Sequence, residues 1–428
     1  MSEGRENLKI PDRKTRILVF MSLSLFLAYL PWYNFSALLK SISAEFHLTA
    51  ADSGMILSAY QAGYVVIVLL SGWLADKVGS KKVVIYATLF TGVFSTSFAW
   101  LAIDKWTILI LRLIIGCASG AIYAPGMALL SNWFPPERRG HALGAYTGGL
   151  VAAYAGSYFI ASPIATSYGW RTGMLTTSLP VFMGCLILWF FVKEKPTDSL
   201  GLNEIKQIQS HSSKLDYKGP ALITLAYMGH MWELYAFWGW IGPFMVASVS
   251  SAGIPSNDAA ALGNQLAAFI VLVGVPAVWL LGLAADKIGR IKAIMIASIA
   301  SLIPQLFFGH LIGQPLSSLM TLGVWIGFWI VADSAIYKAS LTEMTPAHLR
   351  ATLLGVQSAL GFGMTIISPT VFGQILDYYN NGVAPTEAVN WWPSFFILGI
   401  GALLSPIATL ILAKTQNVRK QTSQRCTP

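Results

Sequence analysis

Long apolar segments alternate with short polar links along almost the whole chain. Each segment is rich in Leu, Ile, Val, Phe, Ala and Gly and is about 20 residues long, which matches the hydrocarbon thickness of a bilayer. Such segments predict helices, because a helix satisfies its own backbone hydrogen bonds within lipid. The sequence therefore predicts an all-α membrane protein with twelve transmembrane helices, over residues 16–38, 53–75, 83–103, 107–131, 141–165, 172–192, 218–249, 259–283, 293–313, 316–342, 351–375 and 391–414.

One short link occurs twice in the chain. Gly72–Lys82 reads Gly-Trp-Leu-Ala-Asp-Lys-Val-Gly-Ser-Lys-Lys, and Gly282–Lys292 reads Gly-Leu-Ala-Ala-Asp-Lys-Ile-Gly-Arg-Ile-Lys. Because glycine allows a helix end to turn tightly, each copy predicts a hinge between two helices. The repetition predicts two six-helix bundles, over 16–192 and 218–414, with a polar linker over 193–217 and tails over 1–15 and 415–428.

The basic residues are distributed unevenly between alternate links. Of the 28 Lys and Arg residues, 23 fall in the tails, the central linker and the links on their side, whereas the opposite links hold only Lys40, Lys105 and Arg171. Basic residues accumulate on the cytoplasmic side, so both termini and the central linker are predicted to be cytoplasmic. The first apolar segment lacks a small-residue cleavage site, which predicts a retained helix in a bacterial-type inner (plasma) membrane.

The composition excludes several classes of protein. The chain has 55% hydrophobic residues, 11% charged residues and a mean hydropathy of +0.61, whereas about a quarter of the residues in soluble domains are charged. The net charge of +9 is spread over the links, which argues against nucleic acid as a partner. Cys117, Cys185 and Cys426 predict neither a disulfide framework nor a metal site. The expected partners are the bilayer and a small-molecule substrate, and the expected state is a monomer with no cofactor besides a coupling proton.

The seventh segment carries the most unusual residues within the membrane. A buried carboxylate is costly in a bilayer, so Glu233 is expected to face the bundle interior or a wet cavity, where it would carry the coupling proton together with His230. The alternative is that His230 and Glu233 bond to each other and only fix helix packing. Helical spacing places these two residues on one face with three candidate substrate-contacting residues, Tyr227, Phe237 and Trp240.

The tenth segment adds a second acid and a cation. Asp333 is a further candidate for proton coupling, and a structural bond to a neighbouring helix is the alternative. Lys338 is expected either to reach the cytoplasmic interface or to face the cavity and attract an anion. Candidate cavity residues on the same side of the helix are Trp329 and Tyr337.

The first and fourth segments supply the remaining cavity candidates. Arg112 either attracts an anion or bonds a neighbouring carbonyl group, and Ser119 and Tyr123 follow it at helical spacing. The spacings Gly116-x-x-x-Gly120 and Gly144-x-x-x-Gly148 predict close helix packing. An aromatic face in the first segment either shapes a pocket or anchors the helix at the interface, and it consists of Tyr29, Trp32 and Tyr33.

The repeated hinge and the twelve predicted helices resemble the major facilitator superfamily of secondary transporters over essentially the whole chain. The hinge motif of that family matches Gly72, Asp76, Gly79, Lys81 and Lys82, with a looser copy at Gly282, Asp286, Gly289 and Lys292, and its fourth-helix pattern matches Arg112, Gly116 and Gly120. The resemblance implies alternating access around a cavity lined by helices one, four, seven and ten.

The hinge itself is a candidate conformational latch. Asp76, with Asp286 as its counterpart in the second copy, is expected to accept hydrogen bonds from a helix N-terminus or to pair with Arg139 or Arg350 in one state only. The alternative is a cluster of charges that only sets the orientation in the membrane.

Asn132–Gly140 further resembles the branch of the family that moves organic anions such as sugar acids, although Leu30–Asn34 stands where that branch carries an Asp-Arg pair. The resulting hypothesis is a proton-coupled symporter of a small anionic organic solute that works by alternating access. One alternative is a proton-driven exporter of cationic or drug-like compounds, and another is a transporter-like membrane sensor. No catalytic motif is recognised, so an enzyme is not expected.

Overall fold

The computed structural model describes residues 13–134, 136–194, 217–346 and 349–425, with the backbone alone at 136–141, 257, 351 and 416–425. All regular secondary structure within these residues is helical. The first part of the chain, here called the N-half, comprises α1 (Arg13–Tyr29), α2 (Asn34–Ala37), α3 (Leu39–Phe46), α4 (Ala50–Val78), α5 (Ser80–Leu101), α6 (Lys105–Ser119), α7 (Tyr123–Ser131), α8 (Pro136–Tyr168), α9 (Trp170–Ser178) and α10 (Pro180–Phe191).

The second part, here called the C-half, has a similar order of long and divided helices. It comprises α12 (Lys218–Ser251), α13 (Ser256–Leu272), α14 (Gly274–Ile288), α15 (Arg290–Phe308), η2 (Gly309–Leu311), α16 (Leu316–Ala332), α17 (Ser334–Glu343), α18 (Arg350–Asn380), η4 (Pro385–Glu387), α19 (Trp392–Ala402) and α20 (Leu404–Arg425).

Within the described residues, ten helical stretches are suited to cross a membrane by length and hydropathy alone. They correspond to all of the predicted segments except the first and the seventh. The first span is divided into the short helices α1 and α2. The seventh, α12, is 34 residues long, but its Trp, Tyr, His and Gly residues lower its hydropathy. With these two, the described part of the chain contains the twelve predicted spans.

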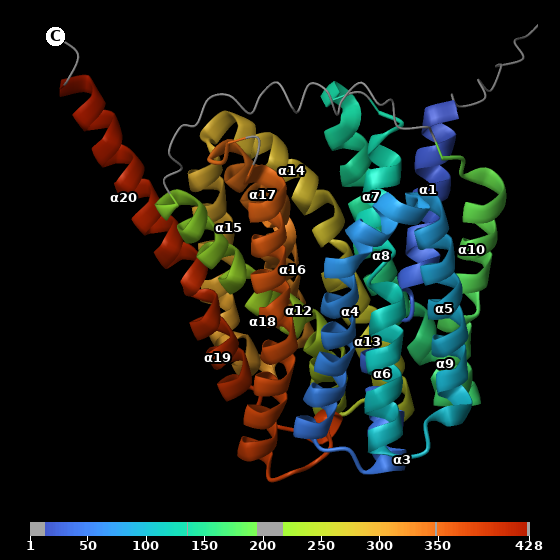
Figure 1. Ribbon diagram of the computed structural model, residues 1–428. Helices are drawn as coiled ribbons and strands as arrows, with labels where there is room; N and C mark the ends of the chain where they lie inside the picture. Colours follow the sequence, from blue (N-terminus) through green and yellow to red (C-terminus); the bar gives the residue numbers. More distant parts are fainter. Residues whose placement is uncertain (1–12, 135, 195–216, 347–348, 426–428) are drawn as a thin grey trace, which may run out of the picture.

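The two halves lie side by side with their helices roughly parallel, the N-half in blue to green and the C-half in olive to red (Figure 1). They contact each other chiefly where α4 packs against α18 and α8 packs against α13. We call the end of the molecule at which α4 and α14 finish and α12 starts the linker face, and the opposite end, which carries α3, the distal face (Figure 1). The charge distribution predicts that the linker face is cytoplasmic.

Both copies of the repeated link form the same tight turn. Gly79 is the single residue between α4 and α5, and Gly289 is the single residue between α14 and α15. Their φ angles are +93° and +92°, in a region that side chains with a Cβ rarely adopt, so glycine is needed at both positions. The predicted hinges are therefore confirmed.

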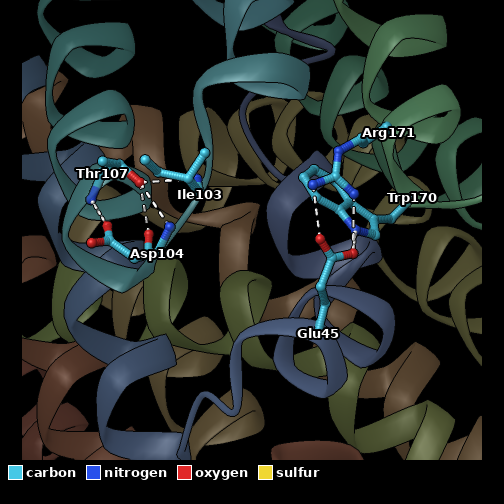
Figure 2. Close-up of polar contacts among 6 residues, drawn as sticks. All are labelled: Glu45, Ile103, Asp104, Thr107, Trp170 and Arg171. Atoms are coloured by element: carbon cyan, nitrogen blue, oxygen red, sulfur yellow. Dashed lines mark hydrogen bonds and ion pairs between the residues drawn. The ribbon is translucent and has the colours of Figure 1, made fainter.

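Polar side chains fix the distal ends of several helices (Figure 2). At the start of α6, the backbone N–H of Thr107 donates to Asp104 Oδ1 at 2.7 Å, and the N–H of Asp104 donates to Thr107 Oγ1 at 3.0 Å. This reciprocal capping satisfies backbone donors that have no partner within the helix. Glu45 at the end of α3 receives hydrogen bonds from Trp170 and Arg171 at the start of α9 (Figure 2).

Candidate functional site

The break in the first span is filled by Arg112 of α6. Pro31 lies in this break, where it interrupts the helical ladder. Arg112 donates from Nη1 to the carbonyl oxygen of Pro31 at 3.0 Å and from Nη2 to that of Trp32 at 2.7 Å. The guanidinium lies 4.3 Å from the ring centre of Tyr60, and Arg112 is only 2% exposed. Among the described residues, no carboxylate lies within ion-pair distance of this cation.

Trp32 lies at the centre of an aromatic cluster that reaches from the N-half to the C-half. Its ring centre lies 4.8 Å from that of Tyr60 on α4 and 5.1 Å from that of Tyr154 on α8. Two residues of α12 meet these rings across the contact between the halves. The ring centre of Tyr235 lies 6.1 Å from that of Trp32, and the ring centre of Trp238 lies 5.1 Å from that of Tyr154. The cluster therefore joins four spans at the contact between the halves.

The acids of the membrane interior belong to the C-half. His230 Nδ1 on α12 lies 3.1 Å from Asp333 Oδ1, an ion-pair distance if the ring is protonated, although the pair does not have good hydrogen-bond geometry. His230 Nε2 lies 2.8 Å from Ser334 Oγ. The hydroxyl of Tyr337 donates to Asp333 Oδ2 at 2.7 Å and lies 2.6 Å from Ser405 Oγ of α20. These contacts form a buried network between α12, the α16–α17 junction and α20.

Glu233 lies one turn along α12 from His230 but does not bond to it. Ser301 Oγ of α15 donates to Glu233 Oε1 at 3.0 Å. The other carboxylate oxygen, Oε2, is buried and has no hydrogen-bond partner among the described residues. The alternative in which His230 and Glu233 satisfy each other is therefore not the arrangement in this structure.

The remaining residues predicted for the cavity lie in different environments. Phe237 packs on Phe308 and Phe395, and Trp240 donates from Nε1 to the carbonyl oxygen of Pro369, so both lie inside the C-half. Trp329 packs on Trp325, which is 49% exposed at the outer surface.

Other predicted residues lie nearer to the aromatic cluster or to the acid network. Tyr29 donates to the carbonyl oxygen of Ser119 at 3.2 Å, Tyr33 contacts the backbone of Tyr235, and the Tyr123 hydroxyl lies 2.8 Å from Thr147 Oγ1. Tyr227 stacks on His230. Lys338 is half-buried on α17, and its side chain makes no hydrogen bond or ion pair with the described residues, although its main-chain carbonyl accepts from Thr342.

The sequence reasoning missed the aromatic residues that α4, α8 and the other face of α12 bring to the cluster. They are Tyr60, Tyr64, Tyr154, Tyr158, Tyr235 and Trp238. A signal was present, because two tyrosine pairs repeat at a spacing of four residues in otherwise apolar segments. Pairs of this kind place two hydroxyl groups on one helix face.

The hinge residues contact their own half of the molecule. Asp286 pairs with Arg290 at 2.7 Å, and Arg290 also bonds to Glu343 at 3.1 Å. Arg350 donates to the carbonyl oxygen of Thr345. Among the predicted latch residues, those of the first copy that are exposed are Gly72, Asp76 and Lys82, and the side chain of Arg139 lies outside the described residues.

In the first hinge, the end of the sixth span and the chain that follows it meet the start of α5. Lys81 Nζ donates to the carbonyl oxygen of Trp189 at 3.1 Å, and the backbone N–H of Lys81 donates to Glu194 Oε1 at 3.4 Å. A carboxylate is favourable near a helix N-terminus. The helix-terminus contact predicted for Asp76 is thus supplied here by Glu194.

Hydrogen bonds between the halves gather toward the distal face. Ser162 donates to the carbonyl oxygen of Ala260, Asn264 donates to that of Ala37, and Thr370 Oγ1 lies 2.8 Å from Ser58 Oγ. Further contacts of the same kind join Ser36 to Gly239, Tyr158 to Trp238 and Lys40 to Ser256. Toward the linker face, Gly144 of α8 and Gly355 of α18 have open space beside them. The halves are therefore closed at the distal face in this conformation.

The sequence is similar to those of known proteins. The family model described as Major Facilitator Superfamily matches residues 21–369. The chain is 24% identical to a hexuronate transporter of Bacillus subtilis (strain 168), over 85% of this chain and 88% of that protein. It is 25% identical to a probable sulfoacetate transporter of Cupriavidus necator, over 92% and 93% of the two chains.

Among solved structures, the fold resembles that of a bacterial homologue of the human lysosomal transporter Spinster, in an inward-facing and occupied conformation. The TM-score is 0.73 with 14% sequence identity, and the alignment covers 95% of this chain and 98% of the other. At this identity the likeness concerns the fold alone.

Proposed function

The chain belongs to the Major Facilitator Superfamily, and on that premise we propose that it is a proton-coupled secondary transporter of a small organic anion. The hexuronate and sulfoacetate transporters that it resembles are named for organic anions. The proposed substrate site is the contact between the halves, where alternating access would expose it to each side in turn.

The observation that carries the proposal is the separation of buried charge between the halves. Arg112 of the N-half is a buried cation whose hydrogen bonds, within the described residues, go only to neutral carbonyl groups, and whose guanidinium lies over the neutral ring of Tyr60. Glu233 and Asp333 lie in the C-half and bond to its own side chains. A buried charge without a counter-charge is costly, so an anionic substrate beside Arg112 would be stabilised there.

Glu233 is the proposed proton carrier. It is 2% exposed, and one of its oxygens has no partner among the described side chains. Taking up a proton would remove the cost of an uncompensated charge, and Ser301 would hold the carboxyl group in place in either form. His230 lies on the same span as Glu233 and forms a second buried pair with Asp333 of the tenth span. We propose that the proton moves on from Glu233 through this pair.

We expect Glu233→Gln to abolish anion uptake that is driven by a pH gradient in proteoliposomes. Glutamine keeps the hydrogen bond to Ser301 but cannot take up the proton. Exchange of labelled for unlabelled anion at equal pH needs no net proton movement, so it should persist. Glu45→Gln, on the distal surface, is the matched control and should leave both reactions unchanged. Gradient-driven uptake at the normal rate in Glu233→Gln would exclude Glu233 as the coupling residue.

The alternative of a cation or drug exporter has less support. Such a mechanism needs acids that face a lipophilic cation across an aromatic wall. The acids Glu233 and Asp333 instead bond to hydroxyl groups within the C-half, and the charged group beside the aromatic cluster is Arg112, a cation.

A further inference from the structure

The aromatic cluster contains a group of buried hydrogen-bond donors with no acceptor in the described part of the chain. We call this group the donor cluster, and it consists of Trp32 Nε1, Tyr60 Oη, Arg112 Nε, Tyr154 Oη and Trp238 Nε1. The members form a continuous series of contacts. The Arg112 guanidinium lies over the Tyr60 ring, and the Tyr60 ring lies beside that of Trp32. The Trp32 ring lies beside that of Tyr154, which in turn contacts the ring of Trp238. Buried polar groups of proteins are nearly always hydrogen-bonded, so several such groups in one place require an explanation.

We propose, resting on the proposed function, that the donor cluster binds the carboxylate of an aromatic monocarboxylic acid and that this is the preferred substrate class. The indole N–H groups and Arg112 Nε can only donate. Their partner must therefore bring acceptors. A carboxylate brings two oxygens that accept several hydrogen bonds, and bonds to an ionised acceptor are stronger than neutral ones.

The surroundings of the donor cluster favour a flat ring in the substrate. The ring centres of Tyr60, Tyr64 and Tyr154 lie 4.8, 4.8 and 5.1 Å from that of Trp32, in tilted and edge-on arrangements. Aromatic rings gain additional stabilisation in these arrangements, and a substrate ring would add one more member. An aliphatic chain would bring no such complementary face.

The donor cluster also argues against sugar acids and dicarboxylates. A sugar acid brings several hydroxyl groups, and each of their O–H donors needs an acceptor, which in the cluster only the two tyrosine oxygens can supply. A dicarboxylate brings a second negative charge. The cluster contains one cation, and two nitrogens of that cation already bond to Pro31 and Trp32.

The position of the donor cluster connects binding to transport. Trp32, Tyr60, Arg112 and Tyr154 belong to the N-half, and Trp238 belongs to the C-half, 5.1 Å from Tyr154. A substrate held there would contact both halves, so its binding energy can differ between the two conformations. A differential affinity of this kind is what allows a ligand to shift a conformational equilibrium.

Calorimetric titration of the full chain in lipid nanodiscs tests the inference, with benzoate, D-glucuronate and succinate as probes. We expect benzoate to bind at least roughly ten-fold more tightly than the other two. Trp32→Phe, Tyr60→Phe and Tyr154→Phe each keep a ring and remove a donor, and each should weaken benzoate binding by roughly five-fold. Trp391→Phe is the matched control, because the indole N–H of Trp391 donates to the carbonyl oxygen of Ala388 inside the C-half. This substitution should leave the affinity for benzoate unchanged.

The outcomes separate the two proposals. Tighter binding of glucuronate or succinate than of benzoate would overturn the substrate class and leave anion transport standing. Benzoate binding that is unchanged in all three donor variants, with melting temperatures close to that of the parent, would overturn the site. Binding of none of these anions would show that the donors serve ordered water alone, and it would also count against the proposed function.

Discussion

The pair formed by Glu45 and Arg171 shows how single residues secure the distal surface (Figure 2). Arg171 bonds to both carboxylate oxygens, at 2.8 and 3.0 Å, and Trp170 Nε1 adds a hydrogen bond at 2.6 Å. The hydrogen bonds from Arg171, supported by the one from Trp170, hold the pKa of Glu45 below its usual range. A carboxylate with a lowered pKa stabilises the folded state only while it is ionised.

This pair predicts a pH-dependent difference between the parent and Glu45→Gln. Above the usual pKa of about 4.3, the pair stabilises the parent, and the contribution is lost as the pH falls through the lower pKa of the folded state. Both side chains are more than a third exposed, so we expect about 1 kcal/mol or less at pH 7. Melting temperatures measured in low salt should differ near pH 7 and approach each other as the pH falls below the lowered pKa of Glu45 in the folded state. A difference that does not change with pH would contradict the ionic account.

At the scale of single residues, the sequence identifies which side chains are unusual but not what they bond to. Glu233, His230, Asp333 and Arg112 could be selected because charge within an apolar segment is costly. Their partners could not, because Ser301 and the carbonyl groups of the first span come from distant parts of the chain. Serines and main-chain carbonyls are too common in sequence to be recognised as partners.

At the scale of helices, small residues decide where two spans approach closely. A Cβ on Gly116 of α6 would lie 2.0 Å from the carbonyl oxygen of Tyr60 on α4, which confirms the predicted close packing. The similar spacing at Gly144 does not lead to the same result, because nothing lies within 4 Å of a Cβ at that position. One spacing pattern thus corresponds to two environments.

Gly116→Ala and Gly144→Ala are therefore a matched pair. The first methyl group meets backbone that cannot move without separating α4 from α6, so we expect a loss of about 1–3 kcal/mol. The second faces open space, and alanine is the better helix former, so stability should stay equal or rise by up to about 1 kcal/mol. Thermal unfolding followed by intrinsic fluorescence measures both. Equal losses in the two variants would refute the packing explanation.

Helix positions were the most predictable feature. The seventh segment was expected over 218–249 and is observed at Lys218–Ser251. What periodicity does not supply is the neighbour that each face meets. Phe237 and Trp240 share a face with Glu233, but that face packs inside the C-half, and the face toward the N-half carries Tyr235 and Trp238. Both faces of this helix are aromatic, so hydropathy alone does not predict which face contacts the N-half.

At the scale of the whole molecule, the distal contact characterises the conformation of this structure. The halves are hydrogen-bonded to each other at the distal face, and the alternating access that we propose requires a second state in which that face is open. The transition to the other state must break the hydrogen bonds between the halves.

A reversible cross-link between the halves tests this requirement. Ser58 Oγ of α4 and Thr370 Oγ1 of α18 lie 2.8 Å apart. In a background without Cys117, Cys185 and Cys426, we expect Ser58→Cys combined with Thr370→Cys to form a disulfide on oxidation that stops anion uptake. Reduction should restore uptake, and each single cysteine variant should be insensitive to oxidant. Uptake at the parent rate by fully cross-linked protein would mean that the distal contact need not open.

Four of the hydrogen bonds that close the distal face share one chemical property. Ser162, Asn264, Ser36 and Tyr158 donate from side chains, and they all have main-chain carbonyl acceptors on the opposite half. Every residue has a main-chain carbonyl group, so each of these hydrogen bonds requires a particular side chain only at the donor position. Saturation mutagenesis should therefore find that these hydrogen bonds constrain the codons of the donors, whereas the codons of the acceptors are constrained only by what their own side chains contact, as at Trp238. The closed state can in this way persist when an acceptor residue is replaced by another that fits the same space.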